Sequence, residues 1–159
     1  MRFIFCFFIV ISSFSFSQDY DQALKCFYAQ DYVCAKIHFS RITQKSDMIN
    51  DKIIEYAHYY LFLSSLRLYN SDTDYLFNEF LLNFPLSEKQ EEAIFFMSEF
   101  LFEKKQYKKV SDLLSELNLY QLDESQKYLA FFYLGYSCYK TNQYDLAKNS
   151  FYELQNDLD

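Results

Sequence analysis

Glycine and proline are almost missing from this chain, which contains one of each in 159 residues. Tight β-turns depend on these two residues, so a sheet of many short strands fits the sequence poorly. Hydrophobic residues make up 51% of the chain, including 19 Phe and 16 Tyr, and a domain of this length can bury them in a core. We therefore expect an all-α fold whose helices are joined by short polar turns.

The single glycine, Gly135, lies inside a predicted helix, where it costs about 1 kcal/mol relative to alanine. One helix face around it, spaced i, i+3, i+4 and i+7, is formed by Phe131, Leu134, Gly135 and Cys138. After the polar segment KTNQ, a second face is formed by Tyr144, Ala147, Phe151 and Leu154.

This spacing resembles the tetratricopeptide repeat, in which W-x2-LG-x2-Y is followed by a turn and then by A-x3-F. In that family the two antiparallel helices touch at the small residue, so the resemblance implies that Gly135 is a packing residue and that close contact offsets its cost. Upstream copies place Ala23 and Ser98 in the glycine position. The most divergent copy has the bulky Phe62 there, and its turn reads as one residue short. Phe77 and Phe80 fit its second helix. The residues expected to pack within and between repeats are Ala23, Ala35, Phe39, Ser98, Val110, Gly135, Ala147 and Phe151.

The resemblance implies about four αα-hairpins, at residues 18–45, 50–85, 87–118 and 123–157, in one domain covering 18–159. They would stack as a short right-handed solenoid like that of tetratricopeptide repeat proteins. The sequence ends directly after a predicted second helix with no polar capping helix. We therefore expect either further repeats after residue 159 or self-association through this uncapped helix.

Residues 1–17, MRFIFCFFIVISSFSFS, have the pattern of a secretory signal peptide with cleavage between Ser17 and Gln18. The apolar run at 3–11 is too short to span a bilayer as a helix, so we expect export without a transmembrane anchor. With these residues and the NFPLS ending of the second hairpin, the chain most resembles the N-terminal part of exported repeat proteins of the Bacteroidetes. That resemblance implies the periplasm or outer cell envelope of a Gram-negative bacterium.

The formal net charge is −7, with 22 acidic and 15 basic residues and no run of Lys or Arg. Nucleic acids and anionic membrane surfaces attract basic patches, so neither is an expected partner.

Few residues suggest catalysis or metal binding. Neither His38 nor His58 has a second His or a Cys at metal-ligand spacing on its helix. We therefore expect each of these two histidines to be packed or solvated. A phosphate-cradling loop needs more glycine than this chain contains. We expect no enzyme activity, no cofactor and no metal.

Three cysteines follow the predicted signal peptide. Cys26 and Cys34 are placed symmetrically about Gln30, the centre of the first predicted turn, and an exported protein permits a disulfide between them. The alternative is that free cysteines serve as small core residues, which is the role expected for Cys138.

The resemblance also implies a concave face formed by the first helix of each hairpin. Besides Glu92, Glu99 and Leu129, it would contain Tyr20, Leu24, Phe27, Tyr56, Tyr59, Leu63, Leu66, Phe95, Phe102, Phe132, Tyr136 and Tyr139. Aromatic residues of this kind are enriched at interface hot spots, which favours a non-enzymatic scaffold that binds a protein or peptide. Alternatively these residues fill gaps between repeats, and the chain is the N-terminal segment of a longer structural solenoid or an accessory to an envelope enzyme.

Overall fold

The computed structural model describes residues 18–44 and 51–156, and the predicted signal peptide lies outside them. Within these two ranges the secondary structure is helical and contains no strand, so the predicted all-α class is confirmed. Contacts divide the chain after Ser87 into two compact units, residues 1–87 (unit 1) and 88–159 (unit 2).

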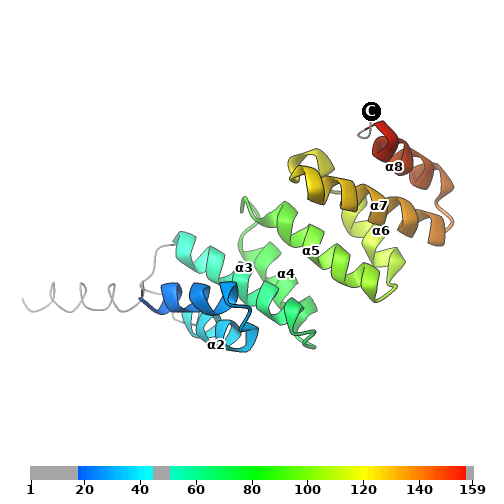
Figure 1. Cartoon of the computed structure of the whole chain (residues 1–159). Helices are drawn as coiled ribbons and strands as arrows, with labels where there is room; N and C mark the ends of the chain where they lie inside the picture. Colours follow the sequence, from blue (N-terminus) through cyan, green and yellow to red (C-terminus); the bar gives the residue numbers. More distant parts are fainter. Residues whose placement is uncertain (1–17, 45–50, 157–159) are drawn as a thin grey trace, which may run out of the picture. The chain divides into compact units, whose positions relative to one another are not determined.

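Unit 1 contains two helical hairpins (Figure 1). The first joins a helix at 18–28 to α2 (Tyr32–Thr43), and the second joins α3 (Asp51–Arg67) to α4 (Thr73–Asn83). Helix α3 packs against both α2 and α4. Its stretch at 61–66 is buried at every position, as is typical of a helix enclosed by neighbours on all sides.

Unit 2 repeats this plan with α5 (Gln90–Glu103) and α6 (Tyr107–Ser115), followed by α7 (Glu124–Lys140) and α8 (Tyr144–Asn156). The link between its hairpins contains a short 3₁₀ turn, η2 (Leu119–Gln121), which packs on α7. Helix α7 contacts α5, α6 and α8 and therefore organises the unit.

In all four hairpins of the described residues, the first helix ends in the same way. In the first, the Gln30 and Asp31 amides donate to the carbonyls of Phe27 and Cys26, which is the Schellman pattern that ends many helices. The same pair of bonds recurs in the other three turns. The residue in the left-handed region is never glycine: it is Gln30, Tyr69, Lys105 or Asn142, with φ between 54° and 63°.

The four hairpins can be aligned on these turn residues, which identifies equivalent positions in each hairpin. Seven residues before each of them lie Ala23, Phe62, Ser98 and Gly135, which are the positions that the sequence pattern aligned, and all four are buried. A methyl group built on Gly135 would lie 2.8 Å from Cε1 of Phe151 on α8. This distance is too short for a normal contact, so the Phe151 ring of α8 occupies the space that a side chain at position 135 of α7 would need.

The second hairpin differs from the other three, and one prediction about it was wrong. Its turn spans residues 68–72, whereas the other turns span 29–31, 104–106 and 141–143. The turn is thus two residues longer than its counterparts, not one residue short. The longer turn accompanies the bulky Phe62, whose ring lies 5.3 Å from that of Phe77 on α4.

Candidate functional site

Four residues expected on the concave face are buried and cannot form a surface. Tyr59, Leu63 and Leu66 on α3 and Phe95 on α5 are each 5% exposed or less. That part of the prediction was wrong because a repeat pattern places a residue on a helix face but does not show what covers the face. In unit 1, the enclosure of α3 buries three of the four residues expected on that helix.

Helix α7 keeps its expected residues at the surface. Phe132 is 39% exposed and Tyr139 is 56% exposed, and Leu129 lies beside them on the same side of the helix at 37%. Tyr136 is half-buried between these exposed neighbours. We call these four residues, together with Phe102 on α5, the α7 face.

Phe102 holds the α7 face together. Its ring centroid lies 4.6 Å from that of Tyr133, 5.5 Å from that of Tyr136 and 6.0 Å from that of Phe132. Tyr107 of α6 also belongs to the cluster: its ring centroid lies 5.7 Å from that of Phe102 and 5.6 Å from that of Tyr136. Rings packed at these distances stabilise one another, so the outer rings are presented in a fixed arrangement.

Polar groups border the α7 face. The Tyr133 hydroxyl donates to Oε1 of Glu99 over 3.2 Å. Burial, with a further contribution from the Glu99 charge, raises the pKa of Tyr133 to about 12, so its phenol stays a hydrogen-bond donor at neutral pH. Lys140 Nζ lies 5.6 Å from the centre of the Tyr136 ring. The border is therefore polar around an aromatic centre, as in many protein interfaces.

In unit 1, the corresponding aromatic residues contact one another more than they form a surface. The ring centroid of Phe27 lies 4.9 Å from that of Tyr60 and 5.5 Å from that of Tyr32. Phe102 of unit 2 contacts Tyr133 and Tyr107 in the same way. Tyr20 packs edge-on against Phe39, and burial is the main reason that its pKa rises to about 12. Each of the remaining expected residues of this unit, Leu24 and Tyr56, is half-buried.

The side of α2 that faces solvent forms a shallow cleft of about 490 Å³ that the sequence analysis did not identify. Val33 and Ile37 are exposed in it, one helical turn apart, and the basic residues Lys36 and Arg41 border it. The sequence signal was available, because apolar residues at i and i+4, with basic residues at i+3 and i+8, indicate an apolar strip on a charged helix.

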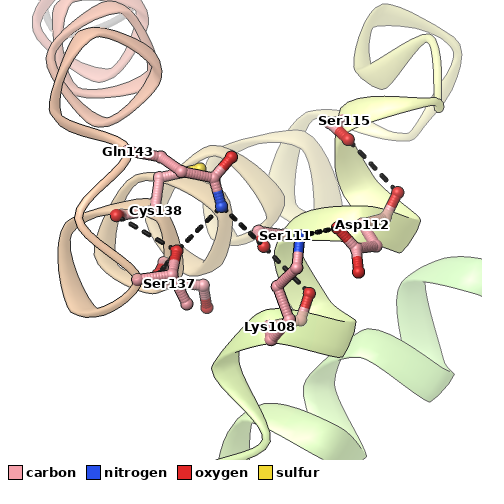
Figure 2. Close-up of polar contacts among 8 residues, drawn as sticks. Lys108, Ser111, Asp112, Ser115, Ser137, Cys138 and Gln143 are labelled. Atoms are coloured by element: carbon pink, nitrogen blue, oxygen red, sulfur yellow. Dashed lines mark hydrogen bonds and ion pairs between the residues drawn. The ribbon is translucent and has the colours of Figure 1, made fainter.

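A polar cluster joins α6 to the turn between α7 and α8 (Figure 2). Gln143 Nε2 donates to Ser111 Oγ over 3.3 Å and to Thr141 Oγ1 over 2.9 Å. Cys138 lies next to this cluster as a buried free thiol, and burial raises its pKa. The cluster connects one hairpin to the next and contains no activated nucleophile.

Cys26 and Cys34 are joined by a disulfide across the first hairpin, with Cα atoms 5.8 Å apart. His38 lies four residues after Cys34 on α2, and a ring nitrogen of His38 and the two sulfur atoms all lie within 4.8 Å of one another. The expectation that His38 has no cysteine at ligand spacing was wrong, because a separation of four residues places both side chains on one helix face.

Comparisons with known proteins give no further guide to function: no family model, no curated protein and no solved structure matches the chain. Within the described residues, none of the helices has the length and apolar character needed to cross a membrane.

Proposed function

We propose that this protein is an exported, non-enzymatic helical-repeat scaffold, built like a tetratricopeptide repeat solenoid, that binds a protein or peptide through the α7 face. The observation that carries the proposal is the exposure of Phe132 and Tyr139 beside a rigid aromatic cluster. A partner segment with apolar side chains, helical or extended, would cover these rings.

The rigidity of the cluster supports this proposal. Phe102 is fixed by rings from α6 and α7, so the surface need not be ordered when a partner binds. Preorganised aromatic residues lose little conformational entropy on binding and often contribute most of the affinity.

The test is site-specific crosslinking in the cell that makes the protein. A photo-crosslinking amino acid at position 139 should yield one major adduct, and Phe132→Ala with Tyr136→Ala should reduce that adduct at least about tenfold. The control is Tyr75→Ala with Leu82→Ala, which removes two apolar residues of α4 that are more exposed than Phe132. Equal losses from the two pairs, or an unchanged adduct with the first pair, would refute binding at the α7 face. Thermal melts should show that all variants fold.

A second candidate function, as part of a longer solenoid, is favoured by α8. Leu146, Phe151 and Tyr152 on this helix are each at least 40% exposed. In stacked repeats, the apolar surface of one hairpin is covered by the next. A further hairpin or a second copy of the chain would cover this surface, and light scattering on the full chain would detect self-association.

A further inference from the structure

The first hairpin brings together three side chains that carry metal-binding atoms. Cys26 comes from the helix at 18–28, and Cys34 and His38 come from α2. The two helices are positioned by the Schellman turn at Gln30 and by the buried Ala23, Ala35 and Phe39, so their placement does not depend on the disulfide alone. Reduction of the disulfide would leave two thiols and an imidazole close together.

The fold does not require these three residues. Unit 2 has the same first hairpin, displaced by 75 residues, since Gln30 corresponds to Lys105 and Ala35 to Val110. At the positions of Cys26, Cys34 and His38, it has Leu101, Lys109 and Leu113. The same turn therefore forms with side chains that cannot bind a metal. The disulfide accounts for Cys26 and Cys34, and the placement of His38 beside them is left to be explained.

The surroundings suit thiolate ligands. Cys34 is the third residue of α2, and its amide donates to the capping Oδ1 of Asp31 over 3.0 Å, so the sulfur lies in the first helical turn. Helix N-termini favour negative charge, including that of a cysteine thiolate. Gln22 Nε2 lies 3.7 Å from the Cys26 sulfur and donates to it. Donors of this kind orient and stabilise metal-bound ligands.

We propose that the reduced first hairpin binds one zinc ion through Cys26 Sγ, Cys34 Sγ and a ring nitrogen of His38. Two thiolates and an imidazole are common zinc ligands, and the fourth position of the tetrahedron would hold water or another ligand. Zn–S bonds of about 2.3 Å require the sulfur atoms to be about 3.8 Å apart, so the metal excludes the disulfide. The hairpin is then cross-linked by a disulfide or by zinc, according to its redox state.

The chemistry of the exchange balances. A dithiol reductant supplies two electrons and two protons, breaks the S–S bond and leaves as its own disulfide. The two cysteine thiols then lose their protons to solvent as zinc binds to the sulfur atoms. An oxidant of the disulfide class reverses the reaction and releases the zinc.

The experiment uses the full chain with Cys6→Ser, so that residues 1–17 contribute no thiol. The protein is reduced without oxygen and titrated with Co²⁺, which reports its own ligands by absorption, and then with Zn²⁺. We expect one Co²⁺ per chain, a thiolate-to-cobalt charge-transfer band, intense visible bands typical of tetrahedral sites, and displacement by Zn²⁺. The oxidised chain should show none of these bands.

Two variants test the assigned ligands. His38→Ala should weaken Zn²⁺ binding at least about tenfold, since even indirect partners of metal ligands contribute that much. The matched control, His58→Ala, removes the other half-buried histidine and should leave affinity and spectrum unchanged. Absence of the thiolate band in the reduced parent chain would overturn the proposal without any variant. It would also be overturned if His38→Ala, shown by circular dichroism to be folded, bound Zn²⁺ as tightly as the parent chain.

Discussion

Units 1 and 2 share one backbone plan but connect their hairpins with different chemistry. In unit 1, Nζ of Lys36, the fifth residue of α2, lies 2.7 Å from Oδ2 of Asp72, the residue that precedes α4. The same two positions in unit 2 hold Ser111 and Gln143, which are joined by the neutral hydrogen bond in Figure 2. The comparison shows that both units have a polar link at this point and that the link need not be charged.

The difference extends to the residue behind each link. Ser65 of α3 donates to Asp72, and the corresponding residue on α7 is the buried Cys138. Partial burial alone would raise the pKa of Asp72, but the hydrogen bonds from Lys36 and Ser65 outweigh it and hold this pKa below its usual value. Unit 1 therefore has a pH-sensitive link where unit 2 has a neutral one.

The largest expected effect concerns the contact between the paired helices. Phe62→Ala should lower the free energy of unfolding of unit 1 by about 3–5 kcal/mol, because a fully buried ring is removed and leaves a cavity. Denaturant unfolding of the full chain would measure it. A loss below 1 kcal/mol would show that α4 closes on α3 as α8 closes on α7, and the two hairpins would then be interchangeable.

The opposite substitution, from a small residue to a large one, can be made at Gly135, the equivalent position of unit 2. Gly135→Leu should destabilise unit 2 by about 1–3 kcal/mol, because the new side chain would occupy the space of the Phe151 ring. Denaturant unfolding again gives the value. Adding Phe151→Ala should recover part of the loss by emptying that space, and no recovery would mean that the contact is not the cause.

A smaller effect is expected at the charged link. Asp72→Asn should cost about 0.5 kcal/mol at pH 7, a modest value because the Asp72 side chain is 44% exposed. With a folded-state pKa below the unfolded value of about 3.9, the carboxylate stabilises unit 1 above that pH, and the effect is lost as the pH falls through the folded pKa. Melts of both proteins should therefore converge in acid. In unit 2, Gln143→Ala should give a pH-independent loss.

The smallest effect is expected at His58, whose equivalent in unit 2 is Phe131. Burial lowers the pKa of His58 despite the nearby Glu79. Because the folded state disfavours the charged ring, unit 1 should lose stability as the pH falls below about 6.5, until the folded-state pKa is passed. His58→Phe introduces the residue found at this position in unit 2. It should remove this dependence of stability on pH, which a pH series of thermal melts would measure. A dependence that persists would have to come from another group.

Local features were the predictable part of this structure. The spacing of Ala23, Ser98 and Gly135 was sufficient to align the hairpins because these residues repeat at fixed distances from their turns. The longer turn before α4 was not predictable from the same pattern. A divergent copy lacks the residues that set its register, so the extra length could be assigned to several places.

The surface was harder to predict than the helices. Tyr59 on α3 and Tyr139 on α7 both fit the repeat pattern of a concave face, yet one is 2% exposed and the other 56%. The difference arises from the neighbouring helices, which a single helix sequence does not specify. The pairing of Cys34 with His38 was different: its spacing of four residues was visible in the sequence and was overlooked.

The chain uses its one glycine at a helix contact, so all four turns adopt a left-handed conformation with ordinary L-residues. Each such residue costs about 1–2 kcal/mol in the folded state. A chain with almost no glycine also has a less varied unfolded ensemble, which reduces the entropy lost on folding. The stability of this protein therefore depends partly on the restricted freedom of its unfolded state, a contribution that no contact between its helices reveals.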